Sequence, residues 1–325
     1  MKEKFYIGLD IGGTKIAAAA VSAKGKIFSR VKTPTPPGAK PAVIFKLLDS
    51  LIAQVLTQGG LSKQQLGGIG IGVPGIVDNS NHILATPNIN LARFPLCAKL
   101  QKKFRVKVSA GNDVNLGLLG EQWLGAGRSA DNIVGIFHGT GVGGAIIIDD
   151  KLVTGTQGAA AEVGHMIMAV DGPRCNCGNH GCLEAFAGRW AIERDIRAAI
   201  KKGRKTLITE LIGKKSGRLG PRGGPIKSKY LKSALAKKDA VTVEIMAKAA
   251  KFLGAACINM RHICNPQLII LGGGVMEACG SFMLPIINKT FHSDPFFAKV
   301  DKCKIVTSKL GDDAVILGAV ALVKK

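Results

Sequence analysis

The chain has 325 residues, enough for two ordinary domains, and 46% of them are hydrophobic. This composition excludes a disordered chain, and no apolar run reaches the ~20 residues of a membrane-spanning helix. The formal net charge of +23 predicts attraction to polyanions, but aromatic residues at only 5% disfavour a stacking platform for single-stranded nucleic acid.

The first half of the sequence predicts two strands around a glycine loop, a third strand, an amphipathic helix and a buried strand. Apolar residues at spacings of three and four mark the helix, and the strands end at glycine or proline. The predicted ranges are 4–11, 14–22 and 26–32 for the first strands, 41–57 for the helix and 67–73 for the last strand.

The same layout then begins again, so we expect two similar α/β domains with a ligand-binding cleft between them. We place the first domain at 1–110 plus 311–325 and the second at 111–310. The later strands are expected at 106–110, 132–137, 145–149, 267–271 and 304–307, and the later helices at 114–123, 241–262, after 272–274, and at 312–323.

Residues 201–238 form a basic segment with thirteen Lys or Arg against a single acid, Glu210. Its Gly/Pro-rich middle predicts an exposed loop with an ordered helix on each side. Charge runs are usually solvated faces, and we favour that interpretation here. Binding of polyphosphate or nucleic acid through this segment is the alternative.

Two glycine loops, each between consecutive strands, are suited to hold phosphates. Glycines let backbone N–H groups approach phosphate oxygens closely. In the first loop, Thr14 adds a hydroxyl and Lys15 a charge, while Asp10 can reach Mg²⁺ through water. A plain β-turn is the alternative interpretation of either loop alone. Two such loops, each between consecutive strands, are harder to explain as turns. Neither matches a P-loop or a Rossmann fingerprint. The loops are Asp10-Ile-Gly12-Gly13-Thr14-Lys15 and Gly139-Thr140-Gly141-Val-Gly-Gly144.

Three of the eight cysteines lie within eight residues, and a histidine precedes them by ten. Three thiolates and one imidazole form a closed tetrahedral set typical of structural zinc. A disulfide at so short a spacing would be strained, and the chain has no signal-peptide pattern, so we expect a reducing, cytoplasmic setting. The expected ligands are His165, Cys175, Cys177 and Cys182.

Acidic and amide side chains flank these features. Asp113 follows a predicted strand and begins a helix. The alternative to a functional role for this residue is that it caps the helix. Glu162 and Glu184 lie next to the zinc ligands, so a metal that fixes the loop also fixes both carboxylates. Several directed acceptors in one pocket suit a polyol substrate.

The whole chain resembles the ROK family of sugar kinases, open reading frames and repressors. The resemblance rests on the two glycine loops and on further motifs: Gly72-Val-Pro-Gly75, Asn112-Asp113, Glu162-Val-Gly-His165, Cys175-Asn-Cys-Gly-Asn-His-Gly-Cys-Leu-Glu184 and Leu271-Gly-Gly-Gly-Val275. It implies the two-lobed actin-like/RNase H-like ATPase fold with a central cleft, commonly a homodimer, and ATP-dependent phosphorylation of a hexose at the entry to glycolysis. It implies ATP, Mg²⁺ and structural Zn²⁺ as cofactors.

The resemblance also assigns roles to matching positions. Asp113 is the expected general base, and the first glycine loop, the second glycine loop and Gly273-Gly274 are expected to bind ATP. The expected sugar ligands are Gly75, Asn112, Asp113, Glu162, His165 and Glu184. Two positions depart from the family pattern: His138 replaces an apolar residue, and Ala161 replaces a common glycine.

Glucose is the first choice of substrate, with N-acetylmannosamine, fructose and other hexoses open. A glucokinase that uses polyphosphate is a second alternative. A sugar-responsive repressor is less favoured, because the first glycine loop begins at Asp10 and leaves no room for a preceding helix-turn-helix domain.

Overall fold

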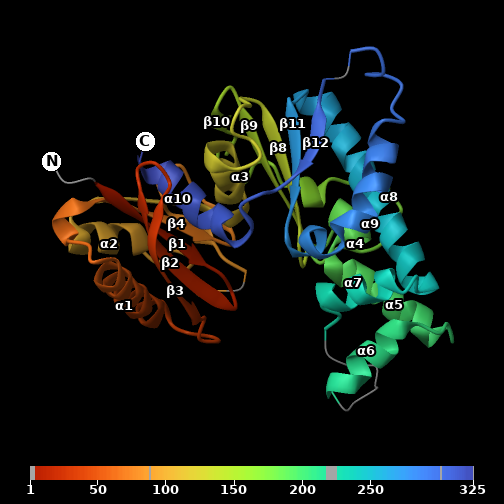
Figure 1. Cartoon of the computed structure of the whole chain (residues 1–325), viewed down its shortest axis with the longest axis horizontal. Coiled ribbons are helices and arrows are strands. Elements are labelled where there is room, and N and C mark those ends of the chain that lie inside the picture. The colour runs from red at the N-terminus through yellow and green to blue at the C-terminus, as the bar shows by residue number, and fades with distance from the viewer. Residues whose placement is uncertain (1–3, 88, 217–224, 301, 325) are drawn as a thin grey trace. The chain divides into compact units, whose positions relative to one another are not determined.

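The structure, a computed structural model, describes residues 4–87, 89–216, 225–300 and 302–324. It divides into two compact units, each assembled from several chain segments (Figure 1). The first unit holds residues 1–133, 145–161 and 308–325, and the second holds 134–144 and 162–307.

A five-stranded mixed sheet organises the first unit. β1 (Phe5–Ile11) pairs antiparallel with β2 (Lys15–Ser22), which pairs with β3 (Ile27–Pro34). On its other side β1 runs parallel to β4 (Leu66–Val73), and β4 to β7 (Lys107–Asn112). The sheet order is β3-β2-β1-β4-β7, and β5 (Ile76–Val77) and β6 (Ile83–Ala85) form a separate hairpin.

Helices cover both faces of this sheet, because side chains alternate along each strand. Ala18 and Ala20 of β2 share a buried cluster with α1 (Pro41–Gly59) and α2 (Leu96–Phe104). Ala17 and Ala19 share another with α10 (Ala314–Lys324) and Trp123 of α3 (Asp113–Leu124). The result is the layered arrangement visible in Figure 1.

A second five-stranded sheet has the order β10-β9-β8-β11-β12 and repeats the topology of the first. β9 (Val142–Ile148) pairs antiparallel with β10 (Lys151–Leu152), and β11 (Leu268–Gly272) runs parallel to β12 (Lys304–Thr307). β8 (Ile133–His138) takes the position of β1. The predicted repeat of strand, glycine loop and strand is therefore confirmed.

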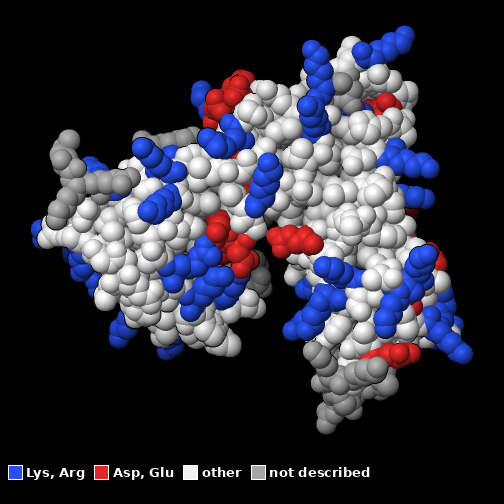
Figure 2. All heavy atoms as spheres, in the orientation of Figure 1, with Lys and Arg blue, Asp and Glu red and all other residues white. Residues whose placement is uncertain are grey.

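The second unit is rich in helices. α8 (Ala240–Cys264) packs against α9 (Gly274–Phe291), α4 (Leu183–Ala187) and α5 (Arg189–Lys201). α6 (Leu207–Ser216) and α7 (Ser228–Ala236) confirm the two helices expected in the basic segment, whose intervening residues 217–224 lie outside the described part. On the face seen in Figure 2, basic side chains gather over the end of this unit that carries α5 to α7.

The unit boundaries differ from those expected from sequence. Residues 111–133 and 145–161 group with the first unit, whereas a boundary at 110/111 assigned them to the second. The physical reason for residues 111–133 is that α3 packs along α10. In addition, the fully buried Glu121 of α3 accepts the N–H groups of Lys309 and Leu310, at 2.9 and 2.8 Å, just before α10.

One helix in the described ranges, α1, is long and apolar enough to cross a membrane by length and composition. Six of its residues are buried, and they belong to the core cluster shared with the first sheet. This is the pattern of a core helix in a globular domain.

Candidate active site

The carboxyl ends of three parallel strands bring the first group of expected site residues together. Asp10 on β1 is in register with Gly72 on β4, and Gly72 with Gly111 on β7. Gly75 follows β4, Asn112 ends β7 and Asp113 begins α3 directly after it, so these residues lie at the same edge of one sheet. Ligands of open α/β sheets bind at this edge.

The first glycine loop is a tight turn between β1 and β2. The N–H of Gly12 donates to the carbonyl of Lys15 at 2.9 Å. The Lys15 ammonium lies 3.0 Å from Asp312, which also contacts Lys32 at 3.2 Å. Burial raises the pKa of Asp10 to about 6, with Asp312 adding to the rise and the two lysines opposing it. At neutral pH the Asp10 carboxylate is therefore mostly ionised and able to attract a cation.

Asn112, and not Asp113, caps α3. The Asn112 side-chain oxygen accepts the N–H groups of Val114 and Asn115 at 2.9 and 3.0 Å, and its amide donates to the carbonyl of Gly75 at 2.9 Å. The cap interpretation of Asp113 is thus corrected: Asp113 is the first helical residue, with one carboxylate oxygen 2.9 Å from the N–H of Val114. A capped helix N-terminus stabilises its negative charge.

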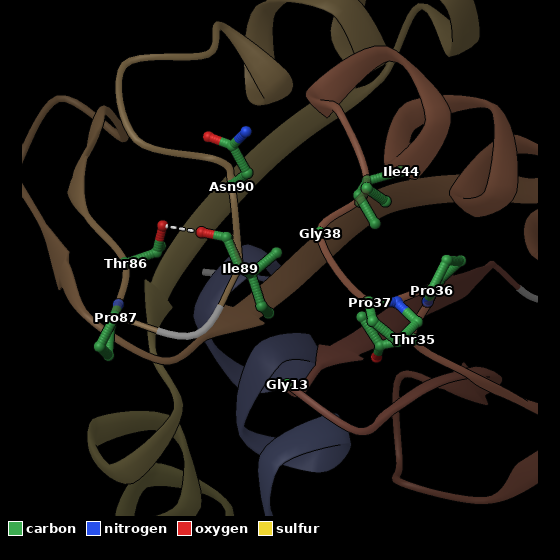
Figure 3. A pocket seen from close by; sticks show the side chains of 11 residues that line it. Gly13, Thr35, Pro36, Pro37, Gly38, Ile44, Thr86, Pro87, Ile89 and Asn90 are labelled. Atoms are coloured by element: carbon green, nitrogen blue, oxygen red, sulfur yellow. Dashed lines mark hydrogen bonds between the residues drawn. The ribbon is translucent and has the colours of Figure 1, made fainter.

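A pocket of about 340 Å³ opens beside Gly13 in the first unit (Figure 3). Prolines and isoleucines make up much of its wall, and Thr35, Thr86 and Asn90 add polar groups. The Thr86 hydroxyl donates to the carbonyl of Ile89, which shapes the loop. The sequence interpretation missed these residues. The proline-rich segment 34–37 and the Thr86-Pro87 pair, both typical of shaped loops, were the available signals.

The second glycine loop, between β8 and β9, is held by neighbours within the second unit. The Glu184 carboxylate accepts the N–H of Val142 at 3.0 Å and the indole N–H of Trp190 at 3.0 Å. A Cβ atom on Gly141 would lie 2.0 Å from the Glu184 carboxylate, so a side chain at position 141 would displace that carboxylate from the loop. Glu184 was expected to bind sugar, and the structure shows it bracing this loop.

Gly273 joins the same assembly. Its φ of +88° favours glycine, and an added Cβ would lie 2.6 Å from the carbonyl oxygen of His138. The buried ring of His138 donates from Nε2 to the carbonyl of Ala187 at 2.6 Å, and burial lowers its pKa to about 4. His138 is therefore a neutral structural contact, and Gly273-Gly274 lies against the strand end that opens the second loop.

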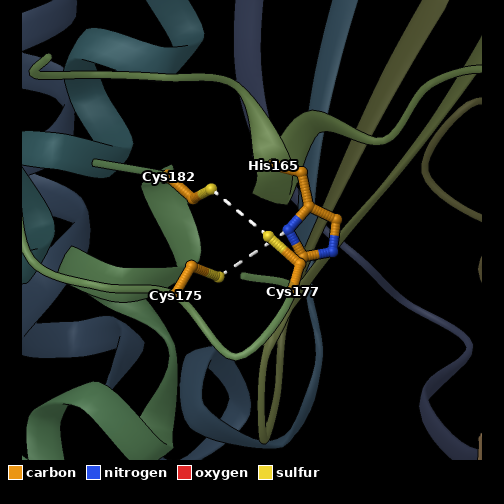
Figure 4. A group of neighbouring side chains, drawn as sticks. All are labelled: His165, Cys175, Cys177 and Cys182. Carbon is orange, nitrogen blue, oxygen red and sulfur yellow. Dashed lines mark hydrogen bonds between the residues drawn. The ribbon is translucent and has the colours of Figure 1, made fainter. Parts of the chain in front are cut away.

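The four expected metal ligands converge on one point (Figure 4). All ligand atoms lie within 4.8 Å of one another, and Cys177 Sγ is 3.7 Å from Cys182 Sγ. Zn–S bonds of ~2.3 Å in a tetrahedron give a sulfur separation of about 3.8 Å, so the spacing fits zinc and excludes a disulfide. Gly178 and Gly181 supply the left-handed turns, with φ of +101° and +72°.

The cluster of His165 and the three cysteines lies next to the second glycine loop. Cys182 is the N-cap of α4, which carries Glu184, and His165 ends the short helical turn Val163–His165. Gly164 in that turn lies against β9, since a Cβ there would be 1.8 Å from the Val142 carbonyl. Glu162 begins the turn. Before it, Ala161 has a φ of +65°, a left-handed conformation that favours glycine.

The predicted site residues therefore form two groups. Asp10, the first glycine loop, Gly75, Asn112 and Asp113 share the first unit. The second glycine loop, Glu162, His165, Glu184, Gly273-Gly274 and the three cysteines share the second. The structure brings together the members of each group.

Comparison with known proteins gives one consistent result. The ROK family pattern matches residues 6–325. A glucokinase of Thermotoga maritima is 35% identical, over 98% of this chain and 97% of its own. A xylose repressor of Caldicellulosiruptor bescii is 30% identical over 98% of this chain and 77% of its own.

A crystal structure of a ROK family glucokinase from Streptomyces griseus, in complex with glucose and AMPPNP, is similar throughout. Its TM-score is 0.81 at 32% identity, covering 98% of this chain and 99% of that one. Fold and site together define a sugar kinase-like α/β protein of the actin-like/RNase H-like ATPase fold, as predicted. The chain belongs to the ROK family.

Proposed function

We propose that the chain transfers the terminal phosphoryl group of ATP to a hydroxyl of a hexose, with glucose and its 6-hydroxyl as the first choice. The proposal rests on the two glycine loops, which occupy equivalent turns of two sheets with the same topology. One loop lies beside Asp10, and the other is braced by the loop that carries the expected metal ligands. The full-length similarity to glucokinases supports glucose over other sugars.

In this mechanism Asp113 accepts the proton of the attacking hydroxyl, while backbone N–H groups of both loops position the phosphates. Phosphoryl transfer depends mainly on such positioning and on neutralisation of charge. Mg²⁺, when bound, would supply part of that neutralisation, and Asp10 would hold it through water. Asn112, Glu162, His165, Glu184 and the backbone of Gly75 orient the sugar.

A sugar panel assayed for release of ADP tests this function. We expect turnover with ATP and glucose to exceed that with N-acetylmannosamine or fructose, and expect none with inorganic polyphosphate as donor. Release of ADP that does not depend on any sugar would contradict the proposal. Turnover with polyphosphate would instead support the alternative donor.

The Asp113→Asn variant tests the general base. We expect kcat to fall by ~10²- to 10⁴-fold, because the proton acceptor is lost, while the sugar Kd stays within several-fold. The matched control is Asp49→Asn, which removes a surface carboxylate of α1 that pairs with Lys103. This variant should keep full activity. Retained turnover in Asp113→Asn would remove it as the base.

The Cys177→Ser variant tests the metal. Cys177 is exposed, so serine costs little packing while it removes one thiolate. We expect one zinc per chain in the unmodified protein by mass spectrometry, and loss of zinc with weaker substrate binding in the variant. Cys264→Ser, outside the cluster, should retain the metal. Zinc-free active protein would overturn the assignment.

We also propose a cytoplasmic location and a homodimer. The free cysteines support the cytoplasmic location, since a thiolate metal site requires a reducing compartment. Sedimentation of the purified protein tests the homodimer.

A further inference from the structure

The first turn of α5 lies directly on the second glycine loop. The backbone N–H of Arg189 donates to the carbonyl of Gly139 at 3.3 Å, and that of Trp190 donates to the carbonyl of Thr140 at 3.2 Å. Both contacts lie within the second unit. The side chain of Arg189 is consequently fixed at the rim of a loop whose backbone is suited to phosphate oxygens.

Among the described residues, the Arg189 guanidinium donates hydrogen bonds to two neutral oxygens. Its Nη2 donates to the Thr140 hydroxyl at 3.0 Å and its Nη1 to the carbonyl of Ile226 at 3.2 Å. Across the described ranges, no carboxylate forms an ion pair with it, and the side chain is only partly buried. By contrast, other arginines of the same unit, Arg194, Arg197 and Arg204, each pair with an acid.

The two glycine loops also differ in charge. The first carries Lys15, whereas the second, residues 139–144, has no cationic residue of its own. Arg189 places a positive charge beside Thr140, which carries the only side-chain hydroxyl in the second loop. A guanidinium offers several N–H donors in a planar fork that matches a phosphate, and such charge-assisted bonds are the strong ones.

We propose that Arg189 binds phosphate oxygens of the nucleotide donor next to Thr140, supplying the positive charge that the second glycine loop lacks. This inference rests on the proposed kinase function and adds a donor-binding residue to it. The residue lies outside every motif from which the sequence interpretation of the site was built.

The test compares two ligands that differ in phosphate content. Calorimetry measures binding of AMPPNP and of adenosine, with Mg²⁺ and without sugar. In Arg189→Met we expect AMPPNP to bind about tenfold more weakly and adenosine within twofold, because only the former carries charge for Arg189. Arg189→Lys should recover part of the loss. Arg204→Met, which also removes one arginine of this unit, should change neither.

The Thr140→Ala variant removes the hydroxyl that Arg189 contacts, and it distinguishes a charge role of Arg189 from a structural one. If Arg189 acts only by holding Thr140, Thr140→Ala should weaken AMPPNP as much as Arg189→Met does. We expect a smaller loss, with less dependence on salt. Thermal unfolding of each variant confirms that it is folded, and Arg189→Lys covers a failure of Arg189→Met to fold.

Three outcomes overturn the inference. Equal weakening of AMPPNP and adenosine, or no weakening in a folded Arg189→Met, refutes the role of Arg189 while leaving the proposed kinase intact. An unmodified protein that does not bind AMPPNP refutes the kinase proposal itself, and this inference with it.

Discussion

Asp10 places a carboxylate where burial disfavours its charged form. Its pKa of about 6 lies above the ordinary value of 3.8, because desolvation outweighs the attraction of Lys15 and Lys32. The native protein therefore holds a proton on Asp10 between pH 4 and 6 that the unfolded chain has released. As pH rises through this window, the protein loses stability.

Asp10→Asn should expose this cost. The amide cannot ionise, so the variant should gain stability relative to the unmodified protein, and the gain should be larger at pH 7 than at pH 4. We expect the gain in free energy of unfolding to differ by about 1–3 kcal/mol between the two pH values, measured by denaturant unfolding without nucleotide. The range allows for partial exposure of the group. A pH-independent effect of Asp10→Asn would contradict this account.

At the residue scale, sequence predicted the metal ligands because their spacing is restrictive, and the structure brings all four side chains together. It did not predict the partners of Glu184. Trp190 and Val142 lie six and forty-two positions away, and their contacts depend on how α4 and α5 pack against the loop. Arg189 was missed for the same reason, because nothing in the local pattern places it next to Thr140.

At the scale of elements, the contact between α3 and α10 depends on small residues. A Cβ on Gly318 of α10 would lie 1.7 Å from the carbonyl oxygen of Leu116, and one on Gly120 would lie 2.2 Å from that of Ala314. Both obstacles are backbone atoms, which cannot rotate away. The two helices approach closely because these glycines lack side chains.

Gly318→Ala should therefore destabilise the protein by about 1–3 kcal/mol, since the helices must move apart. Gly280→Ala in α9 is a matched helical substitution, where the nearest atom to the new Cβ is the Met276 sulfur at 3.4 Å. It should be neutral, or stabilising by up to about 1 kcal/mol, because alanine favours a helix. Urea unfolding compares the two, and equal effects would refute the packing argument.

Long periodic elements such as α1 and α8 were predictable, and so were both strand–loop–strand units, whose boundaries are marked by glycines. The helices α2, α4 and α5 were not. α2 has only nine residues, and α4 has five and directly follows the metal loop. α5 begins after Gly188 without a side-chain cap, so no start signal marks it.

At the scale of the whole molecule, the repeated sheet order follows from a sequence in which strand, glycine loop and strand recur. The sequence did not predict which segments of the chain belong to which unit. Residues 115–121 of α3 are all buried, so its sequence marks no single apolar face, and its packing against α10 assigns it to the first unit. Long-range packing of this kind leaves no local signature.

The interleaved course of the chain has a consequence for synthesis. The first unit needs both its N-terminal strands and α10, which lies against β1 and β4 and is made after the second unit. Part of one face of the first sheet must stay uncovered until the ribosome has made the second unit. We therefore expect the first unit to complete its folding only after the second has been synthesised, with its early strands exposed to self-association in the meantime.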